Sequence, residues 1–152
     1  MRKRFCAFLL MVSLIASLLP AHAAVGGIKL SDKYDMPYYI IVDVTNQITT
    51  VYDTSDDHVV RQMICSTGRH DATPLGQFIM PAQQRTRERG EWYTFQSEDI
   101  LAKYATRIVG NFLFHSILYT AMDDSTLNEE EAAKLGRPAS HGCIRLRVPD
   151  AK

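Results

Sequence analysis

The chain has 152 residues, of which 46% are hydrophobic and 22% are charged. This length suits one domain with a real core and is short for two, and the ordinary composition excludes wholesale disorder. The formal net charge is zero, so the sequence lacks the basic excess of nucleic-acid-binding proteins and excludes that class.

The N-terminus has the three parts of a Sec signal peptide, residues 1–23. Residues 1–4 are basic, residues 5–19 form a continuous apolar run, and Ala21-His22-Ala23 offers an A-x-A cleavage site. The alternative is an uncleaved anchor, but a run of about 15 residues is short for a bilayer that requires about 20. We therefore predict export to the periplasm, cell wall or extracellular space, with no stable membrane insertion after cleavage. Losing three of 17 basic residues would leave the mature chain mildly acidic.

The first folded elements are predicted to be strands. Residues 24–37 form a short linker, and one domain is expected over residues 38–152. Residues 38–44 and 48–53 are rich in β-branched and aromatic residues and are separated by a polar turn, which predicts a strand pair.

Further strands are expected where apolar runs alternate with polar or Gly- and Pro-containing segments. These strands cover residues 58–68, 77–80 and 106–120. Residues 82–91 are polar and predict an exposed hairpin loop, and residues 92–95 form either the next strand or the return of that loop.

A helix is predicted over residues 125–135, with Ser125 as N-cap, acidic residues in its first turn and Gly136 at its end. A loop then enters a strand, and the last four residues could open another helix. The predicted fold is mostly β and contains about six to eight strands and one or two short helices.

One cysteine stands in unusually polar surroundings. Cys143 follows Ser140, His141 and Gly142 and precedes Arg145 by two residues. Because only the thiolate is a good nucleophile and an ordinary thiol has a pKa of about 8.5, a catalytic cysteine needs a basic partner. His141 would share a face with Cys143 if this segment is extended.

His115 is a second candidate for the base, because a polar side chain at the end of a buried strand should face a cleft or a partner. Gly142 leaves the amide of Cys143 open to a substrate oxygen, as an oxyanion hole requires, and Arg145 suits a substrate carboxylate. Taken singly, His115 could be a satisfied core histidine and Arg145 an ordinary surface residue. Together they indicate an exported, cysteine-dependent acyl-transfer site.

Two structural alternatives remain open for the cysteines. In an oxidising compartment Cys65 and Cys143 could form a disulfide, although the surroundings of Cys143 argue against it. A zinc site could use these two residues with His115 and His141, but no C-x-x-C or H-x-x-x-H spacing supports it, and we expect no metal.

The segment SHGCIRL at residues 140–146 resembles the signature of the L,D-transpeptidases of the YkuD type, S/T-H-G-C followed by a segment with Arg or Asn. Residues 38–53 resemble the opening strand pair of that family. Residues 65–80, CSTGRHDATPLGQFIM, resemble its S-T-G…T-P-x-G-x-F segment, and FLFHS at 112–116 resembles its strand ending in His. The resemblance covers residues 38–152 in family order.

The resemblance implies a β-sandwich-like catalytic domain that acts on peptidoglycan peptide stems and needs no cofactor. On the family pattern, Cys143 attacks the carbonyl of the third residue of a donor tetrapeptide stem, a diamino acid, and D-Ala leaves. The side-chain amine of a third residue on a neighbouring stem then resolves the thioester as a 3→3 crosslink. His115 matches the general acid/base.

The resemblance also assigns the residues around these two groups. Ser116 matches a position that helps to hold the site. The remaining positions, which shape the loop and the oxyanion hole or lie near the substrate, are Ser140, His141, Gly142 and Arg145.

Three features depart from the family pattern. The stretch from His115 to His141 is longer than the commoner spacing, and its acidic helix, residues 125–135, is expected to form a lid or insertion beside the cleft. Cys65 stands where the family more often has a small or aliphatic residue, and a buried free thiol is expected there. The chain stops at Lys152, where members usually continue through a helix and a closing strand, so a truncated domain is expected.

Three other functions compete with transpeptidation. An L,D-carboxypeptidase would use the same residues with water in place of the amine. A non-catalytic wall-binding module of the same fold predicts a broken set of catalytic residues, and a disulfide-stapled structural protein predicts no free thiol in the mature chain.

Overall fold

The computed structural model describes residues 36–81, 88–96 and 100–152. The predicted signal peptide and nearly all of the predicted linker lie outside the described residues. Among those described, no helix is both long and apolar enough to cross a membrane. The strands are β1 (Tyr38–Asp43), β2 (Ile48–Asp53), β3 (Val59–Ser66), β4 (Glu88–Arg89), β5 (Trp92–Thr94), β6 (Leu101–Lys103), β7 (Thr106–Val109), β8 (Phe112–Ser116) and β9 (Ile144–Leu146). The helices are α1 (Glu129–Ala132) and α2 (Val148–Ala151), with 3₁₀ turns at Arg69–Asp71 and Asp124–Thr126.

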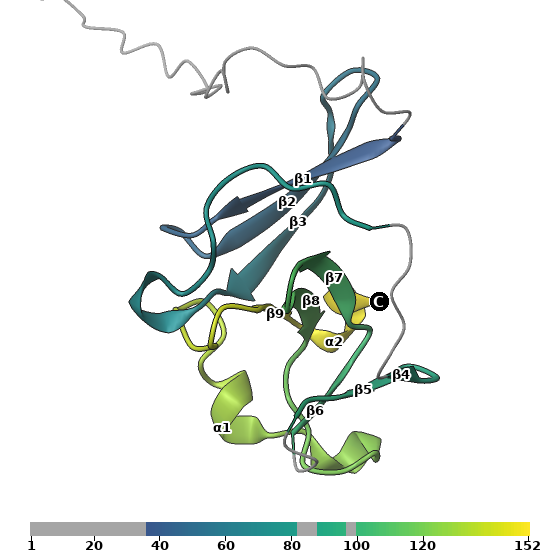
Figure 1. The fold of residues 1–152 in the computed structure, drawn as a ribbon, viewed down its shortest axis with the longest axis vertical. Coiled ribbons are helices and arrows are strands. Elements are labelled where there is room, and N and C mark those ends of the chain that lie inside the picture. Colours follow the sequence, from purple (N-terminus) through teal and green to yellow (C-terminus); the bar gives the residue numbers. More distant parts are fainter. Residues whose placement is uncertain (1–35, 82–87, 97–99) are drawn as a thin grey trace, which may run out of the picture.

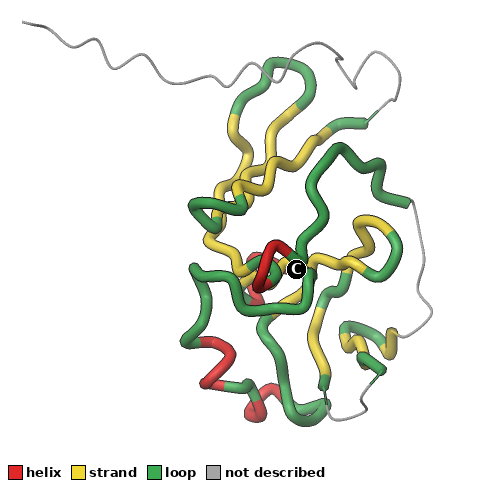
Figure 2. The backbone as a smooth tube through the Cα atoms, turned by 60° about the vertical axis from the view of Figure 1, so that its left-hand side comes forward, coloured by secondary structure: helices red, strands yellow, loops and turns green. Residues whose placement is uncertain are grey.

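Six strands form one sheet in the order β1-β2-β3-β9-β8-β7 (Figure 1). Neighbouring strands are antiparallel except for β8 and β9, which run parallel. Parallel neighbours require a long crossover connection, and residues 117–143 supply it. Loops and short helical turns make up this connection (Figure 2), which includes α1. The predicted mostly β fold is confirmed.

The two faces of the central strands differ because successive side chains point to opposite sides of a sheet. One face carries the main core cluster, and the partly buried Ala151 of α2 packs against it. His115 and Arg145 are register partners in β8 and β9, one position removed from the core residues, and turn to the opposite face. The core cluster consists of Met63, Cys65, Phe114, Ile144 and Leu146.

A second sheet, in the order β4-β5-β6, is fixed to the first by Lys103 and Ser116. The Lys103 amide donates to Ser116 Oγ at 2.8 Å, and that hydroxyl donates to the Ile117 carbonyl at 2.7 Å. The buried Lys103 ammonium pairs with Glu91 at 2.8 Å and with Asp124, and lies 4.4 Å from the centroid of the Trp92 ring. Such a satisfied buried charge holds this sheet against the crossover connection.

Strands β1 and β2 lie where the sequence predicts them, and β3 falls within the predicted third strand. The strand predicted over 77–80 is wrong, because these residues pair with no strand and Phe78 and Ile79 stay 38% and 48% exposed. The single strand predicted over 106–120 is also wrong. Gly110, with φ 52°, turns the chain there, and two strands form instead of one.

The predicted helix is shorter than expected and starts later. Asn128 is the N-cap of α1 and accepts a hydrogen bond from the Glu131 amide at 3.0 Å, whereas Ser125 lies in a 3₁₀ turn capped by Asp123. Helix α1 also ends earlier than predicted, at Ala132, and Gly136, where φ is 93°, lies in the turn that follows. Strand β6 was not predicted from the sequence.

Candidate active site

Sheet register brings Cys143 and His115 together. Strands β8 and β9 pair in parallel with Phe114 opposite Ile144 and His115 opposite Arg145. Continuing this register by one residue puts Cys143 beside Leu113, so the thiol, the imidazole and the Arg145 guanidinium share one face of the sheet. Two residues 28 positions apart in sequence thereby lie on the same face of the sheet and line the same cleft.

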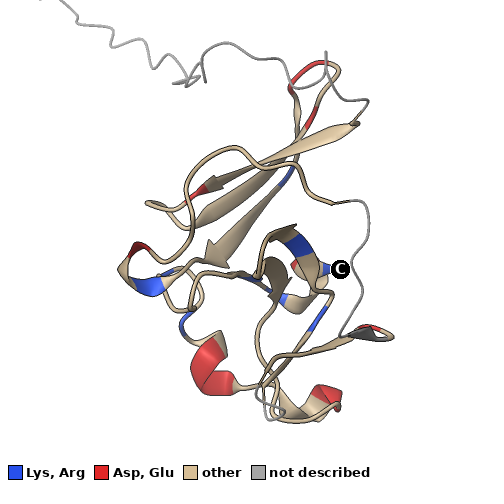
Figure 3. Ribbon diagram, viewed as in Figure 1, with Lys and Arg blue, Asp and Glu red and all other residues tan. Residues whose placement is uncertain are grey.

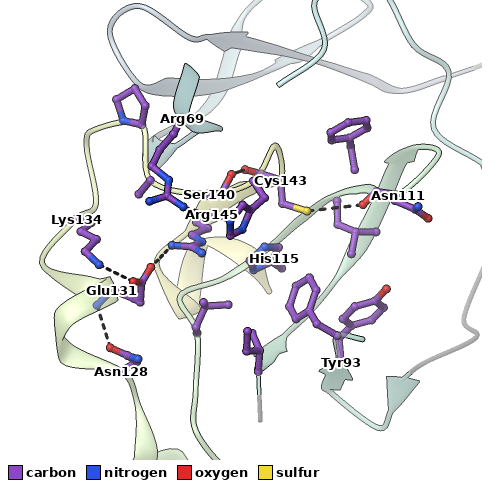
Figure 4. Close-up of a pocket in the computed structure, with 18 of the residues that line it drawn as sticks. Arg69, Tyr93, Asn111, His115, Asn128, Glu131, Lys134, Ser140, Cys143 and Arg145 are labelled. Atoms are coloured by element: carbon purple, nitrogen blue, oxygen red, sulfur yellow. Dashed lines mark hydrogen bonds and ion pairs between the residues drawn. The ribbon is translucent and has the colours of Figure 1, made fainter. Parts of the chain in front are cut away.

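This face opens into a cleft of about 970 Å³. The second sheet lines one side with Tyr93 and Phe95, and the crossover connection lines another with Glu131. Figure 4 shows Cys143 and His115 between these two walls. The predicted position of the acidic insertion beside the cleft is confirmed, because Asn128, Glu131 and Lys134 all line it.

The His115 ring is held in one orientation. Its Nδ1 lies 2.6 Å from the Ser116 carbonyl oxygen, which can only accept, so Nδ1 carries the proton and Nε2 is the free basic nitrogen. The Phe95 ring packs edge-on against the imidazole, with ring centroids 5.1 Å apart. Burial lowers the pKa of His115 to about 4; the Ser116 hydrogen bond opposes this shift and the charge of Arg145 adds to it. The imidazole is therefore neutral at pH 7.

Cys143 is a half-buried free thiol. Its Sγ lies 3.8 Å from the Asn111 carbonyl oxygen, a contact drawn in Figure 4. Burial raises the pKa of this thiol, while the Leu113 amide and the charges of Arg145 and Arg107 partly oppose the rise. A protonated thiol beside a neutral imidazole is a resting state in which His115 can act as a general base.

A tight turn presents Cys143 to the cleft. Ser140 Oγ accepts from the Gly142 amide at 2.9 Å and donates to the Cys143 carbonyl at 2.5 Å. Thr73 Oγ1 accepts from the Gly68 amide at 2.8 Å and donates to the Gly142 carbonyl at 2.9 Å. The T-P segment that the sequence singled out therefore clamps the cysteine turn onto the end of β3.

Arg145 is paired inside the site. It is only 6% exposed, and its Nη1 donates to Glu131 Oε2. Lys134 Nζ lies 2.6 Å from the other oxygen of the same carboxylate. Although burial raises the pKa of Glu131, the hydrogen bond from Lys134 and the charge of Arg145 hold it below its usual value. The carboxylate of Glu131 thus contacts Arg145, which the sequence analysis predicts to bind a substrate carboxylate.

The remaining predicted site residues are placed as follows. His141 is exposed and accepts from the Arg69 guanidinium at 3.2 Å through Nε2, at the rim of the cleft. Ser140 and Arg145 line the cleft, and Gly142 lies directly behind them in the turn. Ser116 turns away from it and bonds to β6, so its contribution is to hold β8 against the second sheet. Their predicted roles toward substrate stay predictions.

Among the residues that line the cleft, four were not predicted as site residues: Phe95, Arg107, Asn111 and Glu131. Arg107 could have been noticed as a single charged residue inside a largely apolar run. The others come close to Cys143 only through the pairing of distant segments.

The thiol of Cys65 is fully buried in the core cluster, on the opposite face of the sheet, and both described cysteines are free. The buried free thiol expected at Cys65 is confirmed. Among described residues, one set of potential metal ligands comes together, Asp53, Asp56 and His58. These lie at the end of β2 and in the turn that follows it, where Asp56 and His58 bond to each other at 2.5 Å, and they do not line the cleft.

Comparison with known proteins agrees with this geometry. The YkuD family profile, described as the L,D-transpeptidase catalytic domain, matches residues 37–152. The chain belongs to the YkuD family of L,D-transpeptidase catalytic domains.

Relatives of this YkuD domain include the Bacillus subtilis (strain 168) protein named "Putative L,D-transpeptidase YciB", which is 37% identical over 120 residues, 75% of this chain and 58% of the relative. The L,D-transpeptidase of Mycobacterium smegmatis shares its fold, with a TM-score of 0.56 at 21% identity over 76% of this chain and 51% of that one. L,D-transpeptidase LdtMt1, solved in complex with imipenem, gives a TM-score of 0.54 at 21% identity over the same shares. The chain therefore spans about half the length of these relatives.

Burial of His115 makes the stability of this YkuD domain depend on pH. Its pKa is about 4 when folded, below the value of about 6.5 expected in the unfolded chain, so the unfolded chain binds more protons between these values. The contribution of His115 to the free energy of unfolding is therefore fully present above about pH 6.5 and is lost as the pH falls toward 4. Denaturant unfolding is expected to lose about 2 kcal/mol between pH 7 and pH 5. In H115Q this part of the loss should disappear. An unchanged pH dependence in H115Q would contradict the conclusion that His115 is buried in its neutral form.

Proposed function

We propose that this chain is an exported peptidoglycan L,D-transpeptidase in which Cys143 is the nucleophile and His115 the general acid/base. The donor is a tetrapeptide stem, and the acceptor is the side-chain amine of a diamino acid in a neighbouring stem. The product is a 3→3 crosslink.

In the acylation step, His115 Nε2 takes the thiol proton as Cys143 Sγ bonds to the carbonyl carbon of the third stem residue. The bond from this carbon to the D-Ala nitrogen then breaks, and His115 returns the proton to that nitrogen. The products of this half-reaction are a thioester and free D-Ala, so atoms and charges balance.

In the second step, the acceptor amine in its neutral form attacks the thioester carbonyl. His115 takes a proton from this nitrogen, the carbon–sulfur bond breaks, and the proton goes to the departing Cys143 sulfur. An amide joins the two stems, and the resting thiol and imidazole are restored.

One observation carries the proposal: a half-buried free thiol and a fully buried neutral imidazole, oriented by the Ser116 carbonyl, line one cleft of a YkuD domain. A wall-binding module would have no use for this arrangement. Export is supported by the signal-peptide pattern of residues 1–23 and by the extracytoplasmic substrate that the reaction requires.

The direct test uses a carbapenem, a class that includes the imipenem bound in the LdtMt1 structure. The purified chain should gain the mass of one carbapenem molecule, and Cys143 should be the modified residue in a peptide digest. A folded chain with titratable thiols and no adduct would contradict the proposal and favour the wall-binding module.

A second measurement separates transpeptidase from carboxypeptidase. The chain is incubated with a disaccharide tetrapeptide, and the products are separated and weighed by mass spectrometry. Dimers that lack one D-Ala are expected, with a 3→3 linkage in the fragment spectrum. Tripeptide monomers alone would show that water resolves the acyl-enzyme, and would assign the L,D-carboxypeptidase activity instead.

A further inference from the structure

The cleft carries a strong excess of positive charge. In the described part of the chain, five cationic residues line the cleft and one carboxylate, Glu131, stands against them. The whole chain has 17 residues of each sign, so this distribution is specific to the cleft. Figure 3 shows acidic residues on α1, on the 3₁₀ turn that precedes it and on several turns elsewhere, while β7 and the segments around β9 carry basic ones. The cations are Arg69, Arg107, Lys134, Arg137 and Arg145.

Two of these cations have unused hydrogen-bonding capacity. The Nε atoms of Arg107 and Arg145 are buried and have no partner among the described residues. Arg145 uses Nη1 for Glu131, and Arg107 uses Nη1 for the Gly110 carbonyl. Within the described ranges no carboxylate lies within ion-pair distance of Arg107. An unpaired buried donor on a charged group is costly, so these two side chains favour a negative charge in the cleft that they line.

Both arginines flank the reacting groups. Arg107 is the register partner of Leu113 in β7 and β8, and Arg145 is the partner of His115 in β8 and β9. The two guanidinium groups therefore come from the strands on either side of β8, with Cys143 and His115 between them. A stem peptide that places its third-residue carbonyl at Cys143 carries carboxyl groups on both sides of that carbonyl.

We propose that Arg107 and Arg145 are paired carboxylate receptors, and that this cleft selects donor stems whose carboxyl groups are free acids over stems in which the same groups are amides. The inference rests on the proposed function and defines its substrate class. Arg107 takes the carboxylate on the β7 side, where it has no protein carboxylate to displace. On the β9 side, Arg145 supplies positive charge from the cleft wall while Glu131 keeps Nη1.

An amide at either position removes the negative charge and replaces one of the two acceptor oxygens with an NH₂ group, which cannot accept from a guanidinium. Loss of one charge-assisted hydrogen bond in a partly buried site corresponds to about a ten- to hundredfold change in affinity. The selectivity should therefore appear mainly in KM. Since Arg137 at the cleft wall is exposed, its contribution should be screened by salt.

The test compares two synthetic disaccharide tetrapeptide donors that differ only in having free carboxyl groups or carboxamides on the second and third residues. Release of D-Ala is measured for the wild-type chain, for R107Q and for K152Q, a matched loss of one positive charge at an exposed residue outside the cleft. The wild-type chain and K152Q should prefer the free acid by about tenfold or more in kcat/KM. R107Q should lose most of this preference, so that its kcat/KM values on the two donors become similar.

Equal kcat/KM values of the wild-type chain on the two donors would overturn the inference, and this comparison needs no variant. An equal loss of rate on both donors in R107Q would also overturn it, because Arg107 would then act on folding or on the thiol alone. The carbapenem adduct separates these outcomes from failure of the proposed function. A chain that forms the adduct and treats both donors alike keeps its catalytic assignment and loses only the selectivity.

Discussion

Acylation of Cys143 is expected to slow about a thousandfold at pH 7 when His115 is replaced by Gln. The wild-type thiol is protonated at this pH, because burial raises its pKa, and it needs Nε2 of His115 to accept its proton. Gln has a similar reach and can still donate a hydrogen bond to the Ser116 carbonyl, but it is not a base. The measurement is the rate of carbapenem adduct formation by intact mass.

The dependence on pH distinguishes a base from a packing residue. The pKa of His115 is about 4, so the wild-type rate should remain near its plateau from pH 7 down to about pH 5, well below the usual histidine range. The rate of H115Q should instead rise about tenfold per pH unit, since it depends on the small thiolate fraction. C143A provides the baseline of no reaction. A rate of H115Q within about fivefold of wild type at pH 7 would contradict the role of His115 as base.

The parts of the fold that depend on local pattern were predictable. Strands β1 and β2 have dense β-branched and aromatic sequences on either side of a polar turn, and both appear where this pattern places them. The single strand predicted over 106–120 was wrong because this largely apolar run was interpreted as one long buried strand. The pair Gly110-Asn111 lies between the two strands and is typical of a two-residue hairpin loop, but this signal was not used.

The same distinction applies to the candidate site. Cys143 and its turn are local in sequence, and His115 stood out as a polar residue in an apolar strand. Arg107 and Phe95 approach the site only through strand pairing and through docking of the second sheet, which a single sequence does not encode in any local pattern. Glu131 was seen as part of an acidic insertion, but its pairing with Arg145 depends on how the crossover connection returns over the sheet.

The role of the T-P segment also became clear only from tertiary contacts. Thr73 bridges the Gly68 amide and the Gly142 carbonyl, so the end of β3 and the cysteine turn are joined through one hydroxyl. A Cβ atom on Gly68 would lie 2.8 Å from the Gly142 Cα. The two glycines are therefore needed for the same close approach of backbone to backbone, and the position of Cys143 depends on it.

A substitution at Gly142 should consequently damage both folding and chemistry. The residue has φ 129°, and a Cβ atom there would lie 2.8 Å from the Ala72 carbonyl oxygen and collide with the Phe112 ring. G142A is expected to unfold about 2–4 kcal/mol more easily and to acylate at least about a hundredfold more slowly, because the turn must shift to relieve the contact. Denaturant unfolding and carbapenem adduct rates measure the two effects.

G90A is the matched control, because Gly90 also has a positive φ, 66°, but no atom lies within 4 Å of an added Cβ. This variant should lose only about 1–2 kcal/mol from backbone strain and should acylate at the wild-type rate. If G142A lost no more stability than G90A and acylated normally, the turn would tolerate a side chain. The position of Cys143 in the cleft would then not depend on close packing of the backbone against Gly142. If G142A were as stable as wild type but acylated slowly, the turn would move without unfolding. The acylation rate would then be more sensitive than the free energy of unfolding to the position of Cys143 relative to His115.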